Sequence, residues 1–434
     1  MNTRATMRKE WGLRMAALLL AAGCLVLWAP AFEAQSLDLC GCASVPNLQP
    51  FDSSNPATFP PGTSDNGSSL RIQVPPSGIL RFSSFSIVNR QVSFTTNNLN
   101  SPVTILVAGD VTVSSANGCC FSFAVSGGNG SAGNGSFAGV GGSGGAGGFR
   151  GGDGAAQAIN GAAIGGAGFG PGGGAAGTAS PFSSGGGATF LGLPELTPIV
   201  GGSGGGGGSS RSSASTGCAG GGGGGGGGGL LIAANGTFTI RDYQIFADGG
   251  NGGGAGDNSC ASPGGGGSGG AIRFVANQLI QSGTVTILAR AGGGATDGRI
   301  RLESVDTSAQ TQFGAQPPAL RIVGPTPLAN PINPTVTIAS VGGHAVPAAP
   351  QGTFGAIDVV LPAPGATPVA VSTTGVPGGT TVEVTIKPRI GGPAVAQTVP
   401  LGNCSTAGAC EALTTFNLAA GAYVVEARAT FQIQ

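Results

Sequence analysis

The chain has 434 residues, with 18 basic and 18 acidic side chains, and its only lysines are Lys9 and Lys387. A neutral chain without a basic block is not suited to bind nucleic acid or an anionic membrane surface, so we expect neither partner. Glycine is the outlier at 87 residues. The glycines do not follow a Gly-X-Y period with proline, which excludes collagen, and the plentiful apolar residues between them argue against a disordered chain.

The N-terminus has the features of a signal peptide. A basic start (Arg4, Arg8, Lys9 and Arg14) precedes an apolar run over 15–29, which is shorter than the roughly 20 residues that span a bilayer as a helix. Small residues favour cleavage after Ala31 or Ala34. We therefore expect a signal peptide over 1–34 and a mature chain without a membrane span, secreted or at the cell surface, with the periplasm as an alternative.

Two other interpretations of the leader remain open. One is an uncleaved membrane anchor. The other is a lipoprotein processed at Cys24, which follows Ala21, Ala22 and Gly23. The apolar stretch continues past Cys24 to Trp28, where a lipoprotein signal would stop, so cleavage after Ala31 or Ala34 is preferred.

The cysteines agree with an exported chain. Of nine, Cys24 lies in the leader and eight remain: Cys40, Cys42, Cys119, Cys120, Cys218, Cys260, Cys404 and Cys410. An even set in an exported protein predicts disulfides. Cys404 with Cys410 would close a short loop, and Cys218 with Cys260 would bracket a glycine-rich stretch. The other four could pair crosswise between 40–42 and 119–120. A zinc site is disfavoured because no histidine lies nearby.

Residues 35–305 are predicted to form one β-rich domain with an internal repeat. Strand-like runs first occur at 70–74, 79–88 and 91–95. The repeat then starts at 104–111, 231–240, 272–280 and 299–302, and the first three copies continue into second strands at 121–125, 243–247 and 285–289. Each second strand runs into glycine. Such a unit buries its apolar face only when copies stack, which predicts a β-solenoid, with Asn235 and Asn277 at matching corners suited to a left-handed backbone or an Asn ladder.

The glycine-rich insertions are expected to leave the solenoid from one corner. The main insertion, 126–229, ends in an unbroken glycine run over 220–229. It fits either a flexible linker or a set of packed extended strands. A Pro/Gln/Ala-rich linker is expected over 306–330. Short strands at 335–338, 356–361, 369–371, 381–386, 414–418 and 423–427 then predict a small C-terminal β-sandwich of the immunoglobulin or fibronectin kind over 331–434.

Catalytic machinery is not evident. His344 is the only histidine and has no Ser or Cys partner suggested by spacing. The acids of the repeat zone are Asp110, Asp242, Asp248, Asp257, Asp297 and Glu303, with Arg241, Arg290, Arg299 and Arg301 nearby. They do not recur at one repeat position, as paired carboxylates on one face would. The stretch 249–257 resembles a calcium-binding glycine/aspartate repeat, but it occurs once. We expect no catalytic residue, cofactor or metal.

The stretches 103–110, 231–252 and 272–294 resemble the right-handed parallel β-helix proteins of the pectate-lyase-like superfamily, and more narrowly glycine-rich exported bacterial proteins. This resemblance implies a fold over roughly 70–305. The Asp and Arg constellation of the lyases has no matching positions, so their activity is not implied. Two functions stay open: a non-enzymatic surface or matrix protein that contacts polysaccharide or other surface proteins, and a β-helix that binds or cleaves extracellular polysaccharide.

Overall fold

The computed structural model describes residues 37–42, 44–97, 99–116, 121–158, 161–178, 183–212, 217–305, 313–328, 334–347, 350, 357–388, 395–405, 408–429 and 431. The expected signal peptide with its cleavage sites, Cys24, Cys119 and Cys120 lie outside the described residues. Within them the chain is almost entirely β-structure, with one 3₁₀ turn at Pro56–Thr58 and no α-helix.

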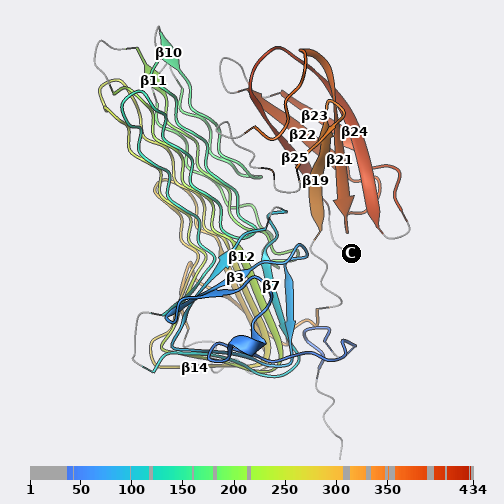
Figure 1. The fold of residues 1–434 in the computed structure, drawn as a ribbon. Coiled ribbons are helices and arrows are strands. Elements are labelled where there is room, and N and C mark those ends of the chain that lie inside the picture. The colour runs from blue at the N-terminus through green and yellow to red at the C-terminus, as the bar shows by residue number, and fades with distance from the viewer. Residues whose placement is uncertain are drawn as a thin grey trace, which may run out of the picture. The chain divides into compact units, whose positions relative to one another are not determined.

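Two long parallel sheets dominate residues 51–323 (Figure 1). The first has nine strands: β1 (Phe51–Asp52), β4 (Ile79–Phe82), β5 (Phe85–Val88), β7 (Val103–Val107), β8 (Val111–Ser114), β12 (Gly229–Arg241), β14 (Ala271–Ser282), β16 (Arg299–Ser304) and β18 (Leu320–Val323). The second has seven: β2 (Ser64–Asp65), β3 (Ser69–Gln73), β6 (Gln91–Thr95), β9 (Ser122–Ala124), β13 (Gln244–Phe246), β15 (Thr286–Leu288) and β17 (Gly314–Gln316). All pairings are parallel except that of β2 with β3.

The repeat copies pair with one another in register. On one side β12 pairs with both β7 and β8, and on the other it pairs with β14. Between β12 and β14 the chain passes through β13 in the second sheet and then returns to the first. The residues of β12 alternate between two cores. Leu230, Ile232 and Ala234 lie in the core between the sheets, whereas Leu231 and Ala233 pack against the outer segments that carry Leu39, Phe190, Leu196 and Ile199. Coverage on both faces explains why the first half of this strand, 229–234, is an uninterrupted run without polar side chains.

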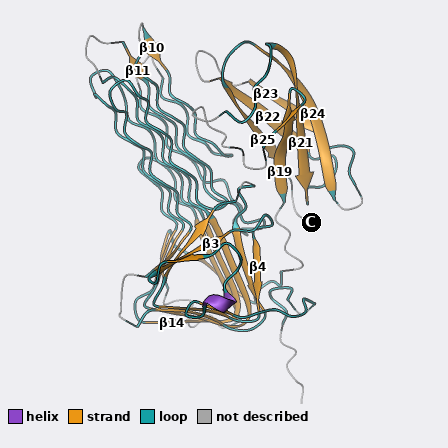
Figure 2. Cartoon of the chain, viewed as in Figure 1, coloured by secondary structure: helices purple, strands orange, loops and turns teal. Residues whose placement is uncertain are grey.

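The glycine-rich insertions form a hydrogen-bonded bundle of extended segments rather than a linker (Figure 2). The segment 220–228 shows the principle. Its amide hydrogens point in three directions in turn, to the carbonyls of segments 149–155, 262–268 and 125–131. Its carbonyls accept in turn from segments 139–145, 202–208 and 250–253. A three-residue period without internal hydrogen bonds is that of a polyproline II-type helix, here surrounded by six neighbours.

Only glycine fits at many interior positions of this bundle, which we call the glycine bundle (125–156, 165–177, 183–189, 201–209, 218–228, 247–256, 261–270 and 289–298). A Cβ added at Gly222, Gly223 or Gly225 would approach a backbone carbonyl oxygen of a neighbouring segment closer than 3.0 Å. At Gly254, on the outside, it would meet nothing within 4 Å. The composition of the insertions therefore follows from the close approach of backbones that have no side chains between them.

Residues 335–429 form a separate set of antiparallel strands. One sheet contains β19 (Thr335–Val341), β20 (His344–Ala345), β21 (Gly365–Thr374) and β24 (Ala409–Leu418), and the other β22 (Thr381–Pro388), β23 (Val395–Pro400) and β25 (Tyr423–Ala429). Residues of both sheets share one hydrophobic core, which includes Val369, Val384 and Phe416. The strand expected at 356–361 is wrong over its described part, 357–361, which is irregular. Its apolar residues Ile357 and Val360 are 75% and 72% exposed.

The linker expected over 306–330 is also wrong in part. Within it, β17 pairs with β15 and β18 pairs with β16, so both parallel sheets extend past residue 305. Leu328 donates its amide hydrogen to the carbonyl of Leu39 and packs against the outer core. Both strands are very short and are separated by Pro317 and Pro318, so they lack the alternation from which strands are predicted.

Three disulfides lie among the described residues. Cys218 pairs with Cys260 and Cys404 with Cys410, as the sequence suggests. Cys40 pairs with Cys42, which corrects the crosswise pairing expected with Cys119 and Cys120. The two cysteines come together because Gly41, with φ of 63°, turns the chain tightly and Asp38 accepts the amide hydrogen of Cys42 at 2.9 Å.

Candidate functional site

The aspartates of the repeat zone tie one copy of the repeat to the next. The Asp110 carboxylate accepts the amide hydrogen of Thr237 at 2.7 Å, and that of Asp242 accepts the amide hydrogen of Thr284 at 2.8 Å. In both cases a glycine precedes the threonine, and a Cβ on Gly236 or Gly283 would collide with the carboxylate. These two acids are thus corner residues that satisfy backbone donors.

A second ladder runs along the first turn of the glycine bundle. Asp248 receives the amide hydrogen of Arg290 at 2.7 Å and forms an ion pair with its guanidinium, also at 2.7 Å. One turn further out, the Asn129 side chain accepts from the amide of Asn251, whose side chain accepts from the amide of Gly293, at 2.8 and 3.1 Å. Asn251 is therefore used to link segments, within the stretch that resembles a calcium repeat.

The predicted asparagine corner differs from expectation. Asn235 neither has a positive φ nor bonds to Asn277; its side chain binds the N-terminal segment, donating to Asp38 at 2.9 Å and accepting from the amide of Cys40 at 3.0 Å. The ladder lies instead at Asn129 and Asn251, where the second strands run into glycine. Positive φ values occur instead at the corner where the chain passes from the first sheet to the second, at Asn89 (52°), Asp242 (48°) and Gly283 (65°).

Glu303 is the most deeply buried acid. Its side chain is fully buried, and its Oε1 accepts from Nε of both Arg273 and Arg301 at 2.7 Å. Arg273 also donates to Oγ1 of Thr197 at 2.6 Å, which fastens the outer segment to the sheet. Burial raises the pKa of Glu303, but hydrogen bonds from Arg301 and Arg273 outweigh it and hold the pKa below its ordinary value of 4.5. The cluster stays ionised and is closed to solvent, as a structural ion pair is.

Sequence reasoning missed Arg273 in this cluster. The residue sits between Ile272 and Phe274 in a buried strand, and only 3% of it is exposed. A lone arginine inside an apolar strand is itself a signal, because a buried charge requires a partner. Arg301 is the register partner of Arg273 in the next copy of the repeat, and Glu303 lies two residues beyond it. Glu303 is therefore the acid that this rule predicts as the partner of Arg273.

The remaining two acids lie at the surface. Asp257 accepts the amide hydrogen of Ser259 at 2.8 Å, a bond that lowers its pKa, and Asp297 accepts that of Ala291 at 2.7 Å. Asp297 also lines a half-open cavity of about 360 Å³, which we call the end cavity. Its walls are formed by Thr189, Phe190, Pro194, Thr296, Asp297, Gly298, Arg299, Ile300, Pro317, Pro318 and Leu320.

The end cavity is the place where an acid and an arginine from the predicted set meet a concave surface. It combines apolar rings (Phe190, Pro317 and Pro318) with the polar groups of Thr296, Asp297 and Arg299. The other predicted residues do not join it: Arg241 is paired with Asp242 at 3.5 Å, and His344 is exposed on β20, opposite Val341. A single carboxylate can bind a ligand but cannot provide the acid–base pair of a glycosidase.

No family model, curated protein or solved structure matches this chain. The described residues contain no group of three His, Cys, Asp or Glu side chains that could hold a metal ion. None of their helices is long and apolar enough to cross a membrane.

Proposed function

We propose that the mature chain is a non-enzymatic secreted or cell-surface protein, structural or adhesive, whose two parallel sheets form a right-handed β-helix that serves as a rigid scaffold. In this proposal the glycine bundle is a stiff extension of the β-helix, and residues 335–429 are a β-sandwich module of the immunoglobulin or fibronectin kind. The two antiparallel sheets with one shared core support the module, and the parallel pairing of successive repeat copies supports the β-helix.

One observation carries the proposal: the acids of the repeat zone are used to hold the scaffold together. Asp110 and Asp242 satisfy backbone donors of the next copy, Asp248 is bonded to Arg290, and Glu303 is buried between two arginines. Polysaccharide-cleaving sites need acids that converge on a groove open to substrate. The three disulfides of the described residues and the signal peptide expected at 1–34 favour export.

Two measurements test the proposal together. The full chain, expressed with its leader in an exporting bacterium, should be labelled by a membrane-impermeant reagent on intact cells or be recovered from the medium. The purified mature protein should release no new reducing ends from a panel of polysaccharides. Retention in the cytosol, or release of reducing ends that disappears in Asp297→Asn, would contradict the proposal.

The end cavity favours a second candidate, which is binding of a saccharide without cleavage. Its volume of about 360 Å³ and its mixture of ring faces with an acid, an arginine and a hydroxyl suit a sugar unit, whose faces are apolar and whose rim is polar. A glycan array tests this candidate. Binding that is lost in Arg299→Gln supports it, and binding that Arg299→Gln leaves unchanged, or no binding to any glycan, rejects it.

A further inference from the structure

The central glycine segment has no side chains with which to define its own register. Its hydrogen bonds to each neighbour recur every three residues, for example from Gly221, Gly224 and Gly227 to one adjacent segment. A shift by three residues would bring equivalent backbone groups together again. Glycine-rich strands specify register weakly for this reason, so the register of the segment must be set at its ends.

Both ends carry the same offset between two segments, 218–228 and 260–270. At the sheet end, Gly229 is the register partner of Ala271, an offset of 271 − 229 = 42. At the outer end, Cys218 is bonded to Cys260, with a sequence separation of 42. Each cysteine therefore precedes its strand by the same number of residues, 229 − 218 = 11 and 271 − 260 = 11.

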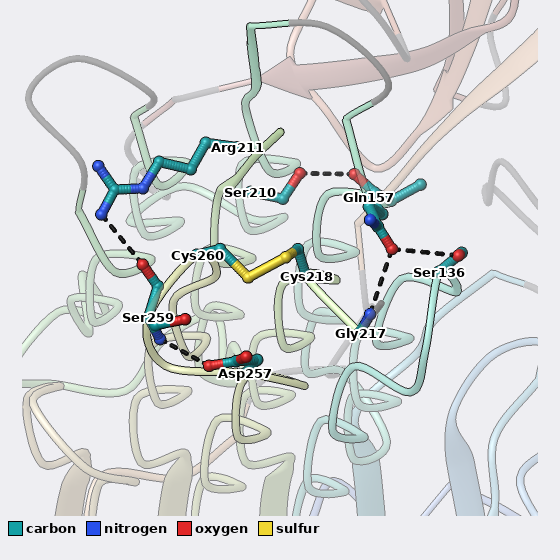
Figure 3. The surroundings of a disulfide bond; sticks show 10 residues. Ser136, Gln157, Ser210, Arg211, Gly217, Cys218, Asp257, Ser259 and Cys260 are labelled. Carbon is teal, nitrogen blue, oxygen red and sulfur yellow. Dashed lines mark hydrogen bonds between the residues drawn. A yellow bond between two sulfur atoms is a disulfide. The ribbon is translucent and has the colours of Figure 1, made fainter. Parts of the chain in front are cut away.

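The disulfide is buried where several outer turns meet (Figure 3). Cys218 is fully buried and Cys260 is 3% exposed. On one side, Oε1 of Gln157 accepts from the amide of Gly217 at 3.3 Å and from the hydroxyl of Ser136 at 3.2 Å. On the other side, Arg211 donates to the carbonyl of Ser259 at 3.0 Å. The bond therefore fixes turns that belong to different segments of the bundle.

We infer that the Cys218–Cys260 disulfide is a register lock for the glycine bundle: once its two thiols are oxidised, the bond fixes the register of segments 218–228 and 260–270. The two sulfurs come within bonding distance only when both segments are in the correct register from the sheet to the outer end. The bond then holds the outer turns together. In the closing step the two thiols lose two protons and two electrons to a disulfide-containing oxidant, which leaves as a dithiol. Because the cytosol keeps thiols reduced, the outer end of the bundle becomes fixed only in an oxidising compartment.

A one-glycine insertion between Gly224 and Gly225 tests the register requirement. It would displace Cys218 by about 3.1 Å and turn it by about a third of a turn. The Cα–Cα distance of 5.2 Å and the direction of the side chain would then no longer suit a disulfide. Alkylation of the unreduced, unfolded protein followed by mass spectrometry should find both thiols free. The same insertion after Gly135, in the turn at Asn134–Phe137, is the matched control and should leave the bond intact.

Hydrogen exchange in the full chain tests the lock itself and does not depend on the insertion folding. In Cys218→Ser/Cys260→Ser, or in the wild type treated with a dithiol reductant, amides near residue 218 should exchange about 10²- to 10³-fold faster, since the bond closes a long loop. Amides of β12 and β14 should not change. Cys404→Ser/Cys410→Ser is the control and should leave the bundle protected. Full disulfide formation in the insertion variant, or unchanged exchange at the outer end without the bond, would overturn the inference.

Discussion

Gly223→Ala offers the sharpest test of the glycine bundle. Gly223 donates to the carbonyl of Gly152 and accepts from the amide of Gly142, both at 2.8 Å. The added Cβ would lie closer than 3.0 Å to the carbonyl oxygen of Gly205, a rigid backbone atom. Relief requires that the segment 201–209 moves away, which also stretches the 2.8 Å bond from Gly205 to Gly224.

The magnitude follows from these bonds. A buried backbone group left without its partner costs about 1–3 kcal/mol. Loss of two or three bonds around Gly223 should therefore reduce the stability of the bundle by about 2–9 kcal/mol. Gly254→Ala is the matched control in the same bundle, because its Cβ meets nothing within 4 Å and its φ is not positive. Its effect should be small or stabilising, by about 0.4–1 kcal/mol through the unfolded chain.

Local hydrogen exchange is the appropriate assay because the chain contains more than one hydrophobic core, so a global unfolding curve would not report on the bundle alone. Amides of 220–228 should lose protection in Gly223→Ala and keep it in Gly254→Ala, with those of β14 as an internal reference. If the two variants behave alike, the segments are not packed backbone to backbone and the reasoning from glycine is refuted.

Four further outcomes follow. Glu303→Gln should destabilise the sheets by about 3–5 kcal/mol in thermal unfolding, because two arginines lose their buried partner; an unchanged Tm would contradict the cluster. Since the pKa of Glu303 is below 4.5 in the folded chain, its contribution is complete above about pH 5 and is lost as the pH falls through the folded pKa, so the acid limb of a stability–pH curve should flatten in Glu303→Gln. The Tyr243 hydroxyl donates to the carbonyl of Arg90, and burial raises its pKa above the ordinary value of 10.0. Stability should therefore fall as the pH rises past about 10, and Tyr243→Phe should abolish that fall. Asp242→Ala should cost about 1–2 kcal/mol and speed exchange at the Thr284 amide, whereas faster exchange elsewhere alone would reject the corner role.

The parallel sheets could be predicted because their signal repeats. The stretches at 104–111, 231–240 and 272–280 are alike, and the structure pairs them through β7, β8, β12 and β14, with one register shift between β12 and β14 after Ala234. The last strands of the two parallel sheets, β17 and β18, escaped prediction because they have few residues and flank Pro317 and Pro318. They are strands only because β15 and β16 provide an edge on which to pair.

The order of the glycine bundle could not be decided from the sequence. A flexible linker and a packed bundle can have the same composition, because glycine makes a linker flexible and also lets backbones approach closely. What distinguishes them is partners: six neighbouring segments, drawn from residues 125–268, must surround 220–228 at the same time. That condition depends on the direction in which each insertion leaves the sheets. The local sequence does not indicate this direction.

The roles of the acids in the repeat zone could not be predicted from the sequence either. Their lack of recurrence argued against a catalytic pair, yet their actual roles depend on the copy that follows. Asp110 matters through Thr237, and Asp242 through Thr284. Only the register between copies shows that the threonine of a Gly–Thr pair, one copy later, donates its amide hydrogen to each carboxylate.

The glycine bundle also explains why the sheets and the outer disulfide are both needed. Fixing one backbone residue costs about 1–2 kcal/mol in conformational entropy, and the cost is greatest for glycine. A net backbone hydrogen bond contributes only about 0.5–1.5 kcal/mol, and the all-glycine segment 220–228 has no side chains that could add a hydrophobic contribution. The segments are therefore close to neutral in stability by themselves. β12 and β14 hold two of them in register at one end, and Cys218–Cys260 holds the same two at the other. An all-backbone structure of this kind is stiff only between two such anchors.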